Sequence, residues 1–356
     1  MPPPSRAIAA RIRAAAAGPI YKTYLAVRNT VLEMLDSAAP GSVASDYWRQ
    51  ELAGFEYMLD ASPLIIEKLR HHSYHLTGLH EYFYRAHHLR SAEPYRQKLK
   101  ALSELDTDGL RVPEARALGG FGFEFDGGLY NLDTLKFYEV LIGMDCAGFL
   151  DVCKRGEKQT VLEIGSGWGG FAYQFKTLFP NTSYVLVDFP QSFLFSSTYL
   201  QTMFPNARIC FRGGAPESYA DIDFSKYDFV FIPHYAWESL TSQRVDLAVN
   251  MVSFQEMRDE QALSYVKQLA KWGCPRLYSL NRDRSPNNAQ ISSVGDIISK
   301  YYKNEEQFIL PVPYHALHLP KKSLLWRFKQ WIKAAVGYRR ARGPLEYRHI
   351  AAKLME

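Results

Sequence analysis

A glycine-rich turn interrupts an apolar run near the middle of the 356-residue chain. Residues 161–171 read Val-Leu-Glu-Ile-Gly-Ser-Gly-Trp-Gly-Gly-Phe, with glycines at 165, 167, 169 and 170. Glycine permits positive φ and lets the backbone approach a ligand that a Cβ would keep away. Because a helix is expected to follow the turn, its free N–H groups would point at the same ligand. The residue types and their spacing therefore predict a loop that cradles a cofactor.

Two cofactors are compatible with the glycine spacing. Gly165, Gly167 and Gly170 match the G-x-G-x-x-G pattern of dinucleotide-binding folds, with Asp188 about 20 residues beyond the turn. Glu163, however, precedes the first glycine by two residues, and a pyrophosphate disfavours a carboxylate at this place. The combination resembles the E-x-G-x-G signature of class I S-adenosylmethionine (SAM) methyltransferases, and the resemblance favours SAM as the cofactor.

The resemblance implies a role for each residue near the turn. Gly165 and Gly167, with Ser166 between them, would pass beneath the methionine part of SAM. Glu163 would support the loop or the cofactor's amino group. Asp188, which ends the segment Ser-Tyr-Val-Leu-Val-Asp, would accept hydrogen bonds from the two ribose hydroxyls, which suit a carboxylate.

A second motif, at residues 245–257, reads Val-Asp-Leu-Ala-Val-Asn-Met-Val-Ser-Phe-Gln-Glu-Met. It predicts a strand with polar residues at its carboxyl end. Together with the glycine turn and residues 277–281, it resembles a family of sugar O-methyltransferases that carry an N-x-x-S-F-x-E-M segment. The resemblance covers roughly residues 118–285. It implies that Asn250 and Ser253 line the methionine end of SAM. It also implies methyl transfer to a sugar hydroxyl, in a surface glycan or its precursor.

A sugar hydroxyl is a weak acid, so methyl transfer to it benefits from a general base as well as from in-line positioning. Glu256 is the first candidate for base or substrate anchor. Its equally supported alternative is a carboxylate that satisfies free N–H groups at a helix start. His234 follows the strand-like segment 227–233. If that strand is third in the sheet, His234 and Tyr235 flank the adenine, which we favour; if it is the central fourth strand, His234 becomes the base.

Acceptor-binding residues are expected at the same edge of the sheet. Arg282 and Arg284 follow a predicted strand and would hold a phosphate or carboxylate of the acceptor. Solvated arginines in a loop are the alternative.

Two aromatic segments complete the predicted acceptor site. Residues 71–88 combine six histidines with Tyr82 and other aromatics, and residues 118–130 contain Phe123. Tyr82 and Phe123 are the candidates for contact with the sugar. The favoured alternative for residues 71–88 is an amphipathic helix with its histidines on the solvated face. Since neither a carboxylate pattern nor paired aspartates complete a ligand set, we expect catalysis without a metal.

These residues require a sheet whose strands end at one edge. Strands alternating with helices indicate a Rossmann-like, doubly wound and mostly parallel α/β sheet, with its ligand at the carboxyl ends of the strands. Helical apolar spacing before residue 110 indicates a helical N-terminal region. The expected strands are 160–164, 183–188, 207–211, 227–233, 245–249 and 276–280, and the expected helices among them are 168–178, 191–203 and 258–271.

The chain accordingly divides into four parts. These are a helical region for acceptor recognition or a lid (1–117), a hairpin or loop with a linking helix (118–156), a SAM-binding methyltransferase domain (157–319) and a basic tail (320–356). The tail contains ten Lys or Arg against two Glu, whereas the rest of the chain is slightly acidic. A basic body that would bind nucleic acid is therefore not expected.

Within the tail, residues 323–340 place apolar side chains on one helical face and basic ones elsewhere. This pattern is typical of a helix on an anionic membrane surface, or of one packed on the protein itself. With no apolar run of 18 residues and no signal peptide, we expect a cytoplasmic protein. If the tail binds lipid, it would do so at the inner face of the membrane; packing on the N-terminal helices is at least as well supported.

SAM-dependent methylation of a sugar hydroxyl is the predicted function, and three alternatives remain. A small non-sugar metabolite would suit the same cofactor site. A nicotinamide-dependent oxidoreductase is disfavoured by Glu163 and by the lack of a recognisable Tyr-x-x-x-Lys pair. A non-catalytic scaffold of a membrane-associated glycan assembly complex is supported by the basic tail.

Overall fold

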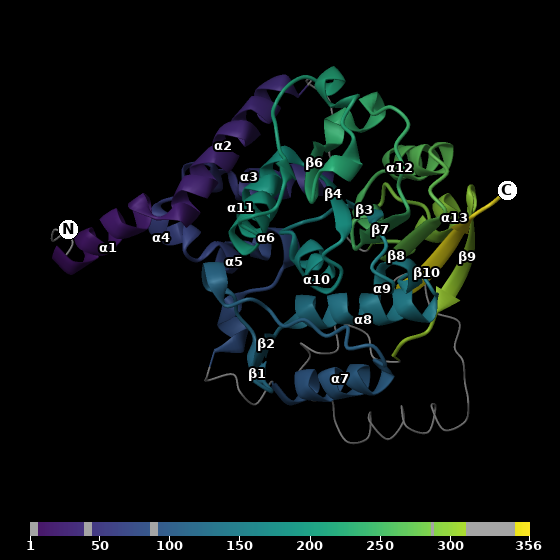
Figure 1. Ribbon diagram of the computed structural model, residues 1–356, viewed down its shortest axis with the longest axis horizontal. Helices are drawn as coiled ribbons and strands as arrows, with labels where there is room; N and C mark the ends of the chain where they lie inside the picture. The colour runs from purple at the N-terminus through teal and green to yellow at the C-terminus, as the bar shows by residue number, and fades with distance from the viewer. Residues whose placement is uncertain (1–5, 39–44, 86–91, 286–287, 311–345) are drawn as a thin grey trace.

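One mixed sheet forms the centre of the protein (Figure 1). The computed structural model describes residues 6–38, 45–85, 92–285, 288–310 and 346–356. Within these ranges the sheet has eight strands, in the spatial order β5 (Ile209–Cys210), β6 (Phe229–Pro233), β4 (Thr182–Asp188), β3 (Gln159–Ile164), β7 (Leu247–Met251), β8 (Arg276–Arg282), β10 (Tyr347–Leu354) and β9 (Tyr302–Gln307). The pairs from β5 to β8 are parallel, and β10 is antiparallel to both its neighbours. The predicted fold class is confirmed.

The order of the strands reverses at β3. After β3 the chain adds β4 and β6 on one side, and then crosses back to place β7 on the other side. Ligands of doubly wound sheets bind at such a switch point. Because β7 pairs directly with β3, the segment around residues 247–251 is the central fourth strand. The strand before His234 lies outside β4 and occupies the third position.

Alternating side chains of the sheet enter two apolar layers. Val161 and Tyr184 belong to one layer, and their neighbours Leu162 and Val185 belong to the other. This alternation follows from the two-residue period of a strand, and both faces of a parallel sheet must be covered. The first layer contains α8 (Leu132–Cys146), α10 (Gly170–Leu178) and α11 (Phe193–Met203), whereas the second contains α12 (Asp259–Lys271) and α13 (Val294–Ser299).

The N-terminal region is helical, as expected, and packs on the first layer (Figure 1). Its α2 lies against α11, and the buried Tyr24 hydroxyl donates to the Met58 carbonyl oxygen at 2.7 Å. The helices of this region are α1 (Arg6–Ala17), α2 (Pro19–Ser37), α3 (Asp46–Gly54), α4 (Pro63–Ile66), α5 (Leu69–His72), α6 (Tyr74–Thr77) and α7 (Ala92–Leu105).

A hairpin joins this region to α8. Strands β1 (Phe123–Phe125) and β2 (Gly128–Tyr130) pair antiparallel, and Asp126 and Gly127 turn the chain with φ of 49° and 77°. The sequence Asp-Gly-Gly predicts such a turn because its residues tolerate positive φ. Asn131 then caps α8, since its side chain accepts from the Thr134 backbone N–H at 3.0 Å. A short helix, α9 (Asp151–Lys154), leads into β3.

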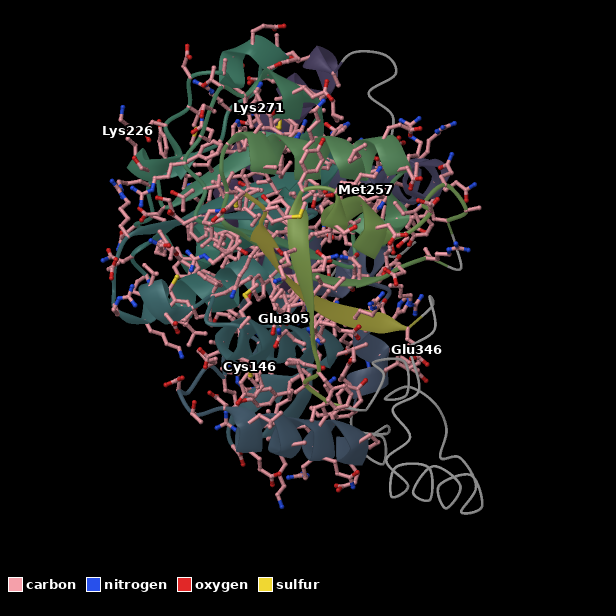
Figure 2. All side chains as sticks on the ribbon, turned by 90° about the vertical axis from the view of Figure 1, so that its right-hand side faces the viewer. Cys146, Lys226, Met257, Lys271, Glu305 and Glu346 are labelled. Atoms are coloured by element: carbon pink, nitrogen blue, oxygen red, sulfur yellow. The ribbon has the colours of Figure 1, made fainter. Side chains whose placement is uncertain are left out.

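The assignment of all residues from 320 to 356 to a tail is wrong for the last of them. Residues 347–354 form β10, which lies between β8 and β9 in the sheet. Figure 2 shows this edge, with Glu305 on β9 and Glu346 just before β10. The segment was missed because basic residues flank small alanines, although Ala351 and Ala352 are buried in opposite layers. The predicted amphipathic segment 323–340 lies outside the described residues.

Candidate functional site

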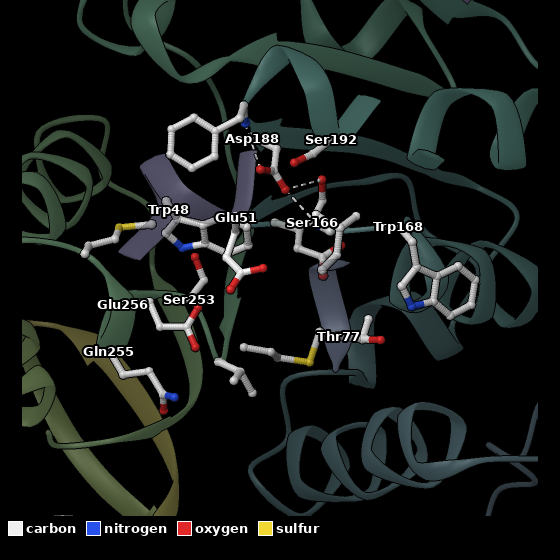
Figure 3. Close-up of a pocket in the computed structure, with 18 of the residues that line it drawn as sticks. Trp48, Glu51, Thr77, Ser166, Trp168, Asp188, Ser192, Ser253, Gln255 and Glu256 are labelled. Atoms are coloured by element: carbon white, nitrogen blue, oxygen red, sulfur yellow. Dashed lines mark hydrogen bonds between the residues drawn. The ribbon is translucent and has the colours of Figure 1, made fainter. Parts of the chain in front are cut away.

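A cavity of about 380 Å³ lies at the carboxyl ends of the parallel strands (Figure 3). Its size is within the usual range for small-molecule sites. One wall is formed by residues that follow β3, β4, β6, β7 and β8. The opposite wall comes from the N-terminal region and from α8, and includes Tyr47, Trp48, Glu51, Tyr74, His75, Thr77 and Lys136. The cavity therefore joins the two regions that the sequence assigned to cofactor and to acceptor.

The glycine turn lies at the base of this cavity. Gly165, Ser166, Gly167 and Trp168 line it, and α10 begins directly after Gly169. Gly165 and Gly167 have φ of 74° and 54°, a region in which side chains are strained. A Cβ on Gly165 would lie 2.1 Å from the Ser253 Oγ. The turn thus brings β3 and the segment after β7 closer together than any larger residue allows.

Gly165→Ala is expected to lower the free energy of unfolding by ~1–3 kcal/mol more than Gly127→Ala does. Both substitutions place a side chain at a positive φ, but only the Cβ at position 165 collides with another atom. Gly127→Ala is the matched control, because Gly127 has a φ of 77° and a Cβ there would meet no atom within 4 Å. Chemical denaturation of both variants measures the difference. Equal losses of stability would show that the close approach of Ser253 is unimportant.

Glu163 is a buried carboxylate at the floor of the cavity. It is 2% exposed, lines the cavity and accepts a hydrogen bond from the Tyr184 hydroxyl at 2.9 Å. Burial raises its pKa to about 8, and the Tyr184 hydrogen bond acts in the opposite direction. Among the described residues no Lys, Arg or His lies within ion-pair distance of Glu163. A buried carboxylate of this kind is stabilised by a cationic ligand.

Asp188 ends β4 and holds the glycine turn. Its Oδ2 accepts from the Gly167 N–H at 2.7 Å, and its Oδ1 accepts from the Phe189 N–H at 2.7 Å (Figure 3). Burial raises its pKa to about 6 despite these hydrogen bonds. The Ser166 hydroxyl donates to Oδ2 as well, at 3.4 Å. A carboxylate has about four acceptor positions, so these three donors leave Asp188 about one position for a ligand.

Aromatic side chains surround the end of the cavity beside Asp188. Phe189 packs against His234 at 4.6 Å between ring centroids and against Trp48 of α3 at 5.8 Å. All three line the cavity, and such surfaces suit a flat aromatic ring. His234 therefore lies where an adenine was expected. Tyr235 does not reach the cavity, because its hydroxyl donates to the Gly214 carbonyl oxygen at 3.0 Å.

Two residues of the second motif have different positions. Ser253 lines the cavity beside Gly165. Asn250 is fully buried: its amide donates to the Ile164 carbonyl oxygen at 2.8 Å, and its Oδ1 accepts from the Phe254 N–H at 3.0 Å. Asn250 therefore joins β3 to the turn after β7 and is a positioning residue, whereas the sequence placed it against the cofactor.

Glu256 faces the cavity from the short 3-10 turn Phe254–Glu256 after β7. Burial raises its pKa to about 7, while Lys136 and Arg282 act to lower it. Helix α12 begins at Asp259 with Arg258 in the N-cap position, so Glu256 is not the cap of that helix. Figure 3 shows the side chains of Glu256, Ser253 and Glu51 in the same space. A carboxylate with a pKa near 7 suits a general base at neutral pH.

Arg282 and Arg284, at the end of β8 and just after it, lie in different environments. Arg282 lines the cavity, and its guanidinium lies 4.5 Å from the centroid of the Tyr347 ring. Arg284 is exposed, and its Nε donates to the Ser292 carbonyl oxygen at 2.9 Å. The cavity residue Tyr347 belongs to β10, which, like β9, is a strand that the sequence did not predict.

Tyr82 and Phe123 do not line the cavity. Tyr82 is half-exposed on the 3-10 turn Glu81–Tyr84. Phe123 is buried in the core beside Tyr84 and Tyr95. From the same aromatic-rich region, Tyr74 and His75 reach the cavity instead. A short apolar segment has no feature that tells a cavity side chain from a core side chain.

A buried ionic group connects the N-terminal region to the glycine turn. Arg70 of α5 pairs with Glu114 at 2.6 Å, and its guanidinium lies 3.4 Å from the centroid of the Trp168 ring. The Trp168 indole N–H donates to Asp133 of α8 at 3.0 Å, and Asp133 pairs with Lys136 at 3.1 Å. The wall that holds Lys136 is therefore fixed relative to the turn that holds Gly167.

The described residues contain no group of three or more His, Cys, Asp or Glu arranged for a metal ion. In the same residues, no helix has the length and apolar character needed to cross a membrane.

The chain shows distant likeness to solved structures of methyltransferases. PigF with SAH is 13% identical, with a TM-score of 0.31 over 55% of this chain and 56% of PigF. An O-methyltransferase family protein from Burkholderia thailandensis is 11% identical, with a TM-score of 0.29 over 63% of this chain and 60% of that protein. Magnesium protoporphyrin IX methyltransferase from Synechocystis PCC 6803, with bound SAM, is 10% identical, with a TM-score of 0.36 over 65% of this chain and 87% of that protein.

The chain thus spans less than two thirds of the first two proteins. No protein-family model and no curated protein matches the sequence. Likeness at this level carries no argument about the cofactor or the acceptor, which rest on the cavity itself.

Proposed function

We propose that this protein is a SAM-dependent O-methyltransferase that methylates a sugar hydroxyl, in a surface glycan or its precursor. The observation that supports it most is the convergence of Glu163, the glycine turn, Asp188 and Glu256 on one cavity at the switch point of the sheet. Tyr47, Tyr74 and Tyr347 supply aromatic surface on the acceptor side, which suits the C–H faces of a sugar ring.

The residues of the cavity fit SAM. Glu163 is buried without an ion-pair partner among the described residues, and it suits the ammonium group of the methionine part. Beside its bonds to Gly167, Phe189 and Ser166, Asp188 retains an acceptor position for a ribose hydroxyl. Phe189 and His234 supply an aromatic site for adenine. When bound, SAM supplies an electrophilic methyl group, and the electron pair of the broken C–S bond remains on sulfur.

Glu256 then serves as the general base. As the oxygen of the acceptor forms its bond to the methyl carbon, the hydroxyl proton passes to the Glu256 carboxylate. The contact between Ser45 Oγ and the Glu256 carbonyl oxygen, at 2.7 Å, connects α3 to the base, so the N-terminal wall and the base keep a fixed distance. Positioning of this kind accounts for much of the rate in transfer reactions.

The alternatives to this function differ in what binds in the cavity. A small non-sugar acceptor would use the same cofactor residues and the same base. A nicotinamide oxidoreductase requires a pyrophosphate beside Glu163, where no Lys, Arg or His of the described residues lies within ion-pair distance of the carboxyl group. The scaffold hypothesis requires neither ligand.

Isothermal titration with SAM, S-adenosylhomocysteine and NADH tests the proposal. We expect micromolar binding of the two adenosyl ligands and none of NADH, and we expect Asp188→Ala to weaken adenosyl binding by at least ~10-fold through loss of charge-assisted hydrogen bonds. Asp221→Ala is the matched control, because Asp221 is an exposed aspartate outside the cavity. Binding of NADH alone would overturn the proposal, and binding of none of the three would favour the scaffold.

A further inference from the structure

Arg282 makes no ion pair with the described residues, although it interacts electrostatically with Glu256 across the cavity. Its Nε is shielded from solvent and has no hydrogen-bond partner, and no carboxylate of the described residues lies within 4.0 Å of it. Two other inward-facing arginines differ: Arg70 pairs with Glu114, and Arg348 pairs with Asp283. A guanidinium that is partly shielded from water and unpaired is costly unless a ligand satisfies it.

The position of Arg282 is fixed by its neighbours. The plane of Tyr347 supports the guanidinium at 4.5 Å, and the Arg282 backbone N–H donates to the Gln255 Oε1 at 2.8 Å. Gln255 precedes Glu256 in the same turn. Arg282 and the proposed base are therefore held in one rigid unit, with both side chains in the cavity.

The second cation on this side of the cavity is already paired. Lys136 lies 3.1 Å from Asp133, which also accepts from the Trp168 indole. Arg282 is consequently the cation available for a ligand. Its planar fork of donors matches the two oxygens of a carboxylate or phosphate group.

We propose that Arg282 binds an oxyanion of the acceptor, so that the substrate is an acidic sugar, either a uronate or a sugar phosphate. This inference rests on the proposed function, because it presupposes that Glu256 faces the reacting hydroxyl. A neutral sugar would leave the guanidinium without an ion-pair partner in the cavity that it lines. The oxyanion at Arg282 instead fixes the ring of the acceptor and presents a neighbouring hydroxyl to Glu256.

The experiment is titration of the protein loaded with S-adenosylhomocysteine, using glucuronate, glucose 1-phosphate and glucose as probes at constant ionic strength. Wild type, Arg282→Gln and Arg284→Gln are compared. Arg284 is the matched control because it loses the same charge on the same loop, yet is exposed and bonded away from the cavity.

We expect one of the two anionic probes to bind wild type at least ~10-fold more tightly than glucose. Arg282→Gln should reduce this preference by roughly 10- to 100-fold, the scale of charge-assisted hydrogen bonds, and Arg284→Gln should leave it unchanged. Which anion binds distinguishes a carboxylate from a phosphate. Equal binding of glucose, equal effects of the two variants, or no binding of either anion up to about 10 mM would overturn the inference. The proposed function fails separately, if S-adenosylhomocysteine itself does not bind.

Discussion

Glu256→Gln is expected to lower methyl transfer by roughly 10²-fold or more, the scale of general-base contributions, with SAM affinity within about threefold of wild type. The amide keeps the size of the side chain but cannot accept the hydroxyl proton. In wild type, turnover should rise with pH through a midpoint near 7, because the pKa of Glu256 is raised to about 7 and the base acts when ionised. The measurement is kcat between pH 5.5 and 8.5 with saturating SAM.

The variant should lose this pH dependence as well as rate, which a merely structural role would not produce. Glu260→Gln is the matched control: Glu260 is an exposed acid in the first turn of α12, a few residues along the same segment. We expect it to keep both turnover and the pH profile. Unchanged turnover in Glu256→Gln, or a pH profile that persists in it, would exclude Glu256 as the base.

SAM affinity is expected to rise with pH up to a plateau above about pH 8, by as much as ~10-fold per pH unit for a single linked group. Burial raises the pKa of Glu163 from 4.5 to about 8, so the ligand-free protein holds a proton that a cationic ligand must displace. Asp188, with a pKa raised to about 6, adds to the trend only at lower pH. Lys136 lowers the pKa of Glu163, but its effect is smaller than the increase caused by burial.

The stability of the ligand-free protein should follow the opposite trend. The pKa of Glu163 is higher in the folded than in the unfolded state, so the folded state binds more protons than the unfolded state between about pH 4.5 and 8. The contribution of Glu163 to the free energy of unfolding therefore falls as pH rises through that window. Titrations and thermal unfolding from pH 5 to 9, with and without SAM, measure both trends.

Two variants separate Glu163 from other causes of these trends. Glu163→Gln should flatten both above pH 6 and weaken SAM binding mainly at high pH. Tyr184→Phe removes a hydrogen bond that lowers the pKa of Glu163, so it should move the midpoint of the affinity curve upward. A curve that is unaffected by either substitution would assign the proton to another group.

The central strands could be predicted from sequence because they are buried on both faces. The six-residue run of β3 and the seven-residue run of β4 are apolar throughout their centres, and their observed bounds differ from the prediction by one residue. β7 begins two residues later than expected, at Leu247. β10 lacked any such signal, because its buried centre consists of histidine, isoleucine and two alanines.

Most residues predicted for the cofactor do line the cavity, whereas those predicted for the acceptor, apart from Arg282, do not. Glu163, Gly165 and Asp188 lie within short motifs whose geometry is local, so their spacing determined their positions. Tyr47, Glu51 and Lys136 reach the cavity through packing between segments far apart in the chain. The motif at residues 245–257 does not by itself show which of its polar residues line the cavity. Asn250 joins β7 to β3, whereas Ser253 and Glu256 line the cavity.

The position of β10 in the sheet has a consequence for biosynthesis. The ribosome completes β3, β4, β6, β7 and β8 well before residues 347–354 emerge, and it adds only ~5–20 residues per second. Until then β8 presents an unpaired edge of the kind that promotes association with other chains, and the support of Arg282 by Tyr347 does not exist. The nascent chain can therefore build the floor of its cavity early, but Tyr347 joins the cavity wall only when β10 inserts.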